Sequence, residues 1–100
     1  MITRIVRMEF QPARVGDFLA HFDTIKNLIR CYPGVQDLEL HRDVSQSNVF
    51  YTYSTWDGEA ELAAYRESDL FKSTWFVVRP WFGEKPQAFS LKEKMVVDGK

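Results

Sequence analysis

Cysteine is nearly absent from this chain of 100 residues, which contains only Cys31. A single cysteine cannot form an intramolecular disulfide, so the sequence does not describe a small disulfide-bonded scaffold. It also has no apolar run of the roughly 20 residues that span a bilayer, and its N-terminus lacks the basic and apolar regions of a secretory signal. We therefore expect a soluble, cytoplasmic protein.

Neither sign of charge predominates in the sequence. Lys and Arg number 13, Asp and Glu number 14, and the formal net charge is -1. Because both signs are interspersed, nothing in the sequence would attract nucleic acid or an anionic membrane, and we expect neither partner. With 45% hydrophobic residues and no linker or repeat, residues 1–100 are expected to form a single domain.

The usual catalytic and metal-binding motifs are also missing. There is no glycine-rich phosphate loop, no cysteine pair and no His-Glu pair at helical spacing, so we expect no nucleotide, zinc or other metal site. His21 lies beside an apolar helical stripe and is expected at the surface or its boundary. His41 lies near a turn, where it could reach a pocket but more simply faces water, and Cys31 has the features of an inert thiol.

Hydrophobic spacing predicts the first half of the fold. A densely apolar stretch at 2–10 predicts a strand covered on both faces. Pro12 can begin a helix that should end near Cys31, because Pro33 and Gly34 favour a turn. This helix is indicated by apolar residues at three-and-four spacing, namely Val15, Phe18, Leu19, Phe22, Ile25 and Ile29.

The middle of the chain predicts a hairpin followed by a helix. Residues 35–42 and 49–56 have the character of strands and are separated by a polar turn. Asp57 can cap a helix that runs to about Arg66.

A further helical segment and a strand should complete the domain. Ser68 or Asp69 can cap the segment, and its apolar stripe comprises Phe71, Trp75, Val78 and Phe82. Gly83 and Pro86 end it, and residues 87–96 should form the last strand. The order βαββαβ predicts an α+β, ferredoxin-like fold, with helices on one face of a four-stranded antiparallel sheet.

The segment at 52–75 resembles the central signature of the antibiotic biosynthesis monooxygenase family. It places Trp-Asp-Gly-Glu at the end of a strand, followed by Leu62, Tyr65 and a Ser-Asp-Leu-Phe step. Other resembling parts are the opening strand, Tyr32-Pro33-Gly34-Val35, Leu38-Glu39-Leu40 and Glu84-Lys85-Pro86 before Phe89. The resemblance implies a dimeric α+β barrel, in which the sheets of two copies pack face to face as a two-fold symmetric homodimer.

Clustered aromatic residues suggest a pocket for a flat hydrophobic ligand, although core packing is their commoner role. Thr52, Ser54 and Trp56 share one strand face, because side chains alternate along a strand. If that face meets the helices, the candidate pocket residues are Arg4, Val6, Thr52, Trp56, Tyr65 and Trp75. We assign no catalytic residue among them.

Two functions follow from this resemblance. Some family members oxidise polycyclic phenols without metal or flavin, by holding a deprotonated substrate beside oxygen in a desolvated pocket. Trp56 matches a tryptophan of those oxygenases, whereas Thr52 stands at the position where they have an asparagine. This implies cofactor-independent oxygenation of a small aromatic or polyketide-like substrate; the alternative is a non-catalytic dimer that binds a hydrophobic metabolite.

Haem degradation, the activity of another branch of the superfamily, is not expected. The asparagine, tryptophan and histidine used there correspond here to Val6, Tyr65 and Trp75. An indole has no suitable lone pair with which to replace a histidine ligand to iron.

Overall fold

A computed structural model describes residues 1–99 as a four-stranded sheet with three α-helices. Two 3-10 turns, η1 and η2, flank the first and last helices. The elements are β1 (Ile2–Glu9), η1 (Pro12–Arg14), α1 (Val15–Arg30), β2 (Val35–Arg42), β3 (Val49–Trp56), α2 (Glu59–Arg66), α3 (Asp69–Val78), η2 (Arg79–Trp81) and β4 (Gln87–Lys92). Their order confirms the predicted α+β, ferredoxin-like fold.

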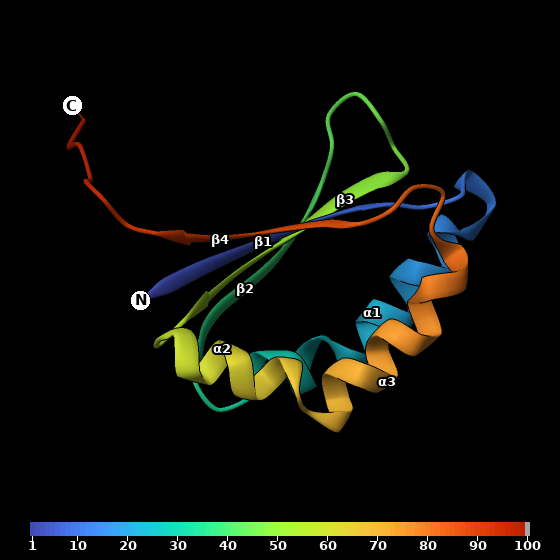
Figure 1. Ribbon diagram of the computed structural model, residues 1–100. Coiled ribbons are helices and arrows are strands. Elements are labelled where there is room, and N and C mark those ends of the chain that lie inside the picture. Colours follow the sequence, from blue (N-terminus) through green and yellow to red (C-terminus); the bar gives the residue numbers. More distant parts are fainter. Residues whose placement is uncertain (100) are drawn as a thin grey trace.

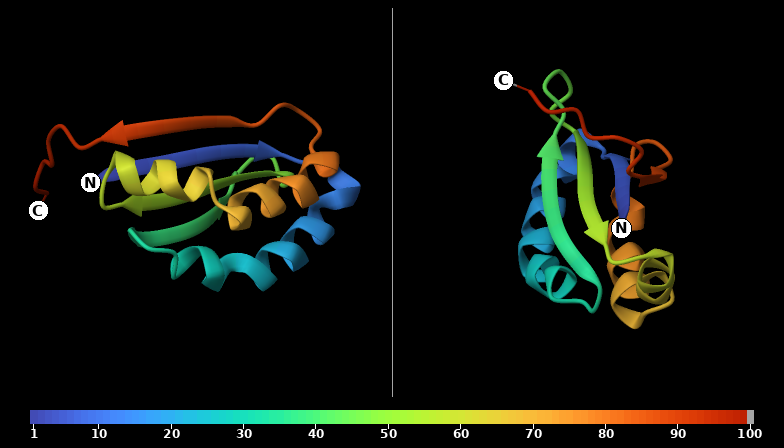
Figure 2. Two further views of the ribbon diagram at one scale, coloured as in Figure 1. Left: turned by 60° about the horizontal axis from the view of Figure 1, so that its bottom comes forward. Right: turned by 90° about the vertical axis from the view of Figure 1, so that its left-hand side faces the viewer.

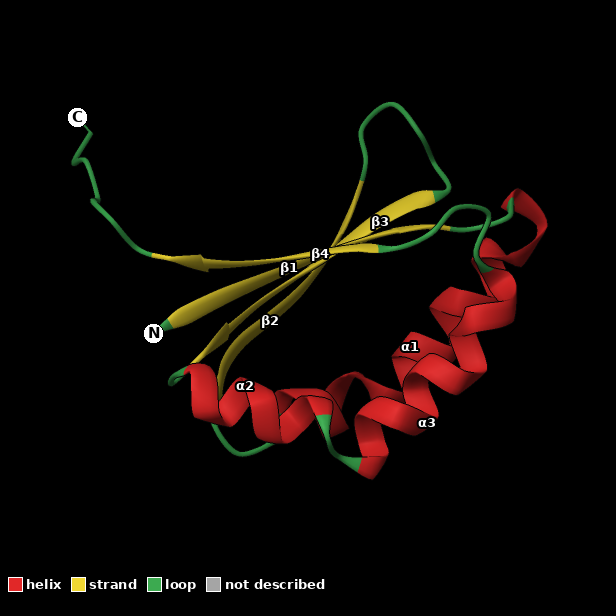
Figure 3. Ribbon diagram, in the orientation of Figure 1, coloured by secondary structure: helices red, strands yellow, loops and turns green. Residues whose placement is uncertain are grey.

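The sheet is open and antiparallel, with the strand order β2-β3-β1-β4. All three helices lie on one of its faces and leave the other without cover (Figures 1 and 3). None of the helices formed by residues 1–99 is long and apolar enough to cross a bilayer.

Strand register determines which side chains face the helices. Val6 pairs with Thr52 on β3 and Ala88 on β4, and this row faces the helices. Ile5 pairs with Tyr53 and Phe89, so that row lies on the opposite, uncovered face.

The helices cover the sheet as a single layer (Figure 2). Two buried clusters of side chains join this layer to the sheet. The first is centred on Phe10, Phe18 and Phe50, and the rings of Phe10 and Phe18 stack with their centroids 4.2 Å apart. The second contains Trp56 and Leu62 and includes Val35. Large apolar side chains at both ends thus hold the helices against the sheet.

The predicted helix ends are partly correct. Cys31 ends α1 as expected, and the Ser68 side chain caps α3 by accepting a hydrogen bond from the Phe71 N–H at 3.1 Å. The expectation that Asp57 caps α2 is wrong. Gly58 occupies the cap, and the Asp57 carboxylate accepts a hydrogen bond from Gln36 Nε2 at 2.6 Å instead.

The predicted last strand is too long. It was expected to reach Val96 but ends at Lys92, which pairs with Ile2 at the start of β1. Because β1 begins at Ile2, the pairing between the two strands ends at this residue pair. The last predicted helix is also too long, since it ends at Val78 and Phe82 lies on extended backbone.

Candidate ligand pocket

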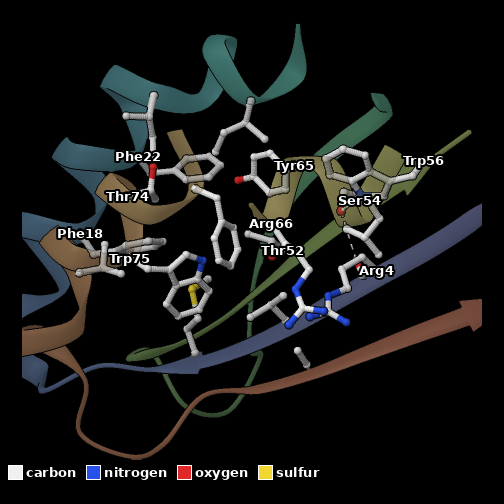
Figure 4. A pocket seen from close by; sticks show the side chains of 18 residues that line it. Arg4, Phe18, Phe22, Thr52, Ser54, Trp56, Tyr65, Arg66, Thr74 and Trp75 are labelled. Atoms are coloured by element: carbon white, nitrogen blue, oxygen red, sulfur yellow. Dashed lines mark hydrogen bonds between the residues drawn. The ribbon is translucent and has the colours of Figure 1, made fainter. Parts of the chain in front are cut away.

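A cavity of about 110 Å³ lies between the helices and the sheet (Figure 4). Strands β1 and β3 form its floor, while α1, α2 and α3 form its walls. All six sequence candidates line it, namely Arg4, Val6, Thr52, Trp56, Tyr65 and Trp75. The face of β3 that contains Thr52 and Trp56 is thus the face that meets the helices.

An aromatic wall runs along one side of the cavity. The ring centroids of Trp56 and Tyr65 are 4.9 Å apart, those of Tyr65 and Phe71 are 5.3 Å apart, and those of Phe71 and Trp75 are 5.8 Å apart. Phe71 was not among the predicted pocket residues, although the aromatic stripe of α3 includes it. A flat apolar ligand could pack against this wall.

Not every aromatic residue of this region reaches the cavity. Tyr51 and Tyr53 alternate with Thr52 along β3 and therefore lie on the uncovered face of the sheet. Phe76 is 73% exposed on α3. These three side chains do not line the pocket.

Trp56 is fixed within the protein by a hydrogen bond. Its side chain is buried, and its Nε1–H donates to Ser54 Oγ at 3.0 Å. Ser54 lies two residues earlier on the same strand face and also lines the cavity. The indole N–H therefore has a partner within the protein, and the role of Trp56 in the wall is to present its ring.

Tyr65 contributes a hydroxyl group to this apolar space. Figure 4 shows that the hydroxyl points away from Trp56 and into the pocket. Burial, with a smaller contribution from Tyr32, raises the pKa of Tyr65 to about 12. The phenol consequently stays protonated at neutral pH and can donate a hydrogen bond to an oxygen atom of a ligand.

A second hydroxyl comes from Thr74 on α3. Its Oγ1 is buried and has no hydrogen-bond partner within residues 1–99. Since buried polar atoms are normally paired, this atom is available to a ligand. Thr74 falls on the same helical face as Phe71 and Val78, and that spacing could have identified it.

Two arginines meet at the sheet side of the cavity. Figure 4 shows the guanidinium groups of Arg4 and Arg66 side by side. Arg4 Nη1 donates to Ser90 Oγ at 2.8 Å, and the pKa of Arg4 is lowered by burial and then by the charge of Arg66. Arg66 was not predicted, although it follows Leu62 by one helical turn and both side chains line the pocket.

Proton-accepting side chains lie elsewhere in the described chain. The lining contains no His, Cys, Asp or Glu among residues 1–99. His21 is half-buried next to the Trp81 ring, as predicted for a boundary residue, and His41 is exposed beside Glu39. No group of three His, Cys, Asp or Glu side chains in the same range could hold a metal ion.

The sequence matches one protein family. The model of the antibiotic biosynthesis monooxygenase family matches residues 1–74, a range that includes β1 to α2 and the first six residues of α3. No curated protein matches the chain.

Solved structures share the fold over nearly the whole chain. A protein from Nitrosomonas europaea, named provisionally as an antibiotic biosynthesis monooxygenase, has a TM-score of 0.86 at 15% identity; the match covers 93% of this chain and 98% of that one. One from Bordetella bronchiseptica with the same provisional name has a TM-score of 0.82 at 23% identity and coverages of 94% and 97%. At these identities the likeness shows the fold alone.

Proposed function

The chain belongs to the antibiotic biosynthesis monooxygenase family, and from this premise we propose that it oxygenates a small aromatic substrate without a cofactor. The observation that supports this function is the aromatic-walled cavity, with the Tyr65 hydroxyl pointing into it and two guanidinium groups at its edge. Rings of the wall would hold a flat substrate. The polar groups would orient its oxygen atoms.

The substrate would supply the electrons in this reaction. A phenol with an activated ring methylene, once deprotonated, passes electrons to O₂, and the CH₂ group and O₂ become C=O and H₂O. One oxygen atom forms the carbonyl group, the other leaves in water with the two hydrogens, and the balance needs no external reductant. A neutral Tyr65 hydroxyl and the nearby positive charges would stabilise the anion in a site that excludes water.

The volume of the cavity favours a small substrate over a polyketide-like one. Drug-sized ligands occupy pockets of roughly 300–1,000 Å³, and an engineered cavity of about 150 Å³ holds one benzene molecule. At about 110 Å³, this cavity would enclose about one ring, and any further part of the substrate would extend through its opening.

Oxygen uptake with labelled gas tests the proposal. The protein would be supplied with ¹⁸O₂ and a panel of one- to three-ring phenols that includes 1,8-dihydroxyanthrone, and the product would be examined by mass spectrometry. We expect ¹⁸O in the product at a rate above that of protein-free autoxidation. Tyr65→Phe keeps the ring but removes the donor, and should lower the rate by about 10²-fold. No acceleration with any phenol would contradict the oxygenase function.

A non-catalytic ligand-binding domain is the second candidate. It is favoured by the lack of a His, Cys, Asp or Glu in the pocket lining of residues 1–99, because such a side chain would usually accept the proton of the substrate. Under this alternative, aromatic ligands bind to the same pocket, yet oxygen is not consumed.

We also propose that a second copy of the chain covers the bare face of the sheet. Its exposed apolar side chains are Tyr53, Phe89 and Leu91, which are 37%, 51% and 49% accessible. They lie beside Ile5 in neighbouring strands, as Phe89 and Tyr53 both pair with that residue. An apolar patch of this kind suits the sheet-to-sheet contact implied by the family resemblance.

A further inference from the structure

The cavity opens to solvent at its arginine end. Arg66 on α2 and Ala88 on β4 are the exposed residues of the lining, whereas the other lining residues are buried or half-buried. Arg4 lies between these elements on β1, next to β4 in the sheet. A ligand that enters the pocket here passes between two positive charges.

These two charges lack a counter-charge. Neither Arg4 nor Arg66 forms an ion pair with a carboxylate within residues 1–99. Two neighbouring guanidinium groups repel each other, and partial burial of Arg4 adds the cost of desolvation. The lowered pKa of Arg4 has these two causes. An anion at this position would offset the repulsion and compensate the cost of desolvation by charge attraction.

Both arginines come from elements that are packed in place at this end of the cavity. The bond from Arg4 to Ser90 Oγ joins the Arg4 side chain to β4 and keeps its guanidinium at the opening. Arg66 is the last residue of α2, and this helix is anchored by Leu62, which packs with Trp56 in the core. Guanidinium groups offer paired N–H donors in a planar fork, which matches the two oxygens of a carboxylate.

We propose that the pocket selects aromatic carboxylates, with the carboxylate between Arg4 and Arg66 and the ring against the Trp56–Tyr65–Phe71 wall. This assignment rests on the proposed function, whose substrate class it narrows. A phenolic hydroxyl at the far end of such a ligand would meet the hydroxyls of Tyr65 and Thr74, which line the cavity from α2 and α3.

Matched ligands of equal shape provide the test. Binding of 4-hydroxybenzoate and of its neutral counterpart 4-hydroxybenzamide to the full chain would be measured by isothermal titration calorimetry at millimolar ligand concentrations. We expect the carboxylate to bind about tenfold more tightly than the amide. In the double variant Arg4→Gln and Arg66→Gln, this preference should fall to about twofold or less, because the carboxylate loses more affinity than the amide.

A control variant separates local from overall charge. Arg79→Gln removes the same charge from an exposed residue outside the pocket lining and should keep the preference for the carboxylate. The proposal is overturned if 4-hydroxybenzoate does not bind, if the native chain shows no preference, or if the double variant retains it. Circular dichroism of each variant would show that the fold is intact.

The binding test and the oxygen-uptake test can fail separately. Carboxylate selectivity without turnover of any phenol would remove the oxygenase function and leave an anion-selective binding protein. Oxygenation that is equally fast for acidic and neutral phenols, and insensitive to the arginine substitutions, would retain the function and overturn the arginine assignment.

Discussion

At the scale of single residues, Trp56 joins the strand, the helices and the pocket. Its ring packs against Tyr65, its N–H is bonded to Ser54, and its side chain is 1% exposed. Burial of so large a side chain contributes strongly to the free energy of folding.

Replacement of Trp56 by alanine should therefore lower the free energy of unfolding by about 3–5 kcal/mol, because it leaves a cavity in the core. Urea denaturation would measure the change. Phe76→Ala removes an aromatic side chain that is 73% exposed on α3 and should change the value by no more than about 0.5 kcal/mol. Equal midpoints for the two variants would contradict the structural role of Trp56.

Tyr65 should make stability depend on pH in the alkaline range. Its pKa is raised from 10.0 to about 12 in the folded state, so folding favours the protonated phenol. The contribution of the protonated phenol to the free energy of unfolding is complete below pH 10. It is lost as the pH rises through about 12, and the free energy of unfolding then falls by about 2–3 kcal/mol in total. Denaturation at several alkaline pH values would reveal it. Tyr65→Phe should reduce this pH dependence relative to the native chain, and an unchanged dependence would count against the burial of the hydroxyl.

At the scale of elements, the turn from α1 into β2 depends on one glycine. Gly34 has a φ of +93°, a conformation that other residues seldom adopt, and its carbonyl accepts a hydrogen bond from the Asp57 N–H at 2.8 Å. The turn thus also positions the start of α2. A side chain at this position would meet Glu61 on α2, since an added Cβ would lie 2.6 Å from Glu61 Cβ.

Gly34→Ala is accordingly expected to reduce the free energy of unfolding by roughly 1–3 kcal/mol, through backbone strain and this contact. Gly16→Ala is the matched control. Gly16 lies near the start of α1 with open space around it, so alanine should stabilise the helix by about 0.5–1 kcal/mol. Thermal unfolding of both variants would test the contrast, and a neutral Gly34→Ala would show that the turn relaxes.

At the scale of the whole molecule, the uncovered sheet face is the surface on which we propose that a second copy packs. Light scattering should give the mass of a dimer at micromolar concentration. Phe89→Asp would place a charge in the proposed contact and should yield monomers whose helical circular dichroism is unchanged, because Phe89 is half exposed in the single chain. A native chain that is monomeric under these conditions would refute the proposed dimer.

From the sequence alone, the order and type of the elements could be predicted, whereas the strand face that meets the helices stayed open. Local physics is sufficient for these features: apolar spacing marked α1, proline and glycine ended it, and Ser68 capped α3. The sequence also supplied the six pocket candidates, in part through the family resemblance. The prediction that Asp57 caps α2 was wrong because a tertiary contact competed with the local signal. Its carboxylate accepts a hydrogen bond from Gln36 on β2 instead.

How distant residues meet became visible in the folded chain alone. Strand β4 ends at Lys92, where its partner β1 begins with Ile2. The sequence of β4 itself does not indicate this end. Arg4 and Arg66 likewise meet because α2 packs against β3, the neighbour of β1 in the sheet, which brings together side chains 62 positions apart. Such contacts depend on the packing of several elements at once, so the opening of the pocket and its positive charge could be recognised only in the folded chain.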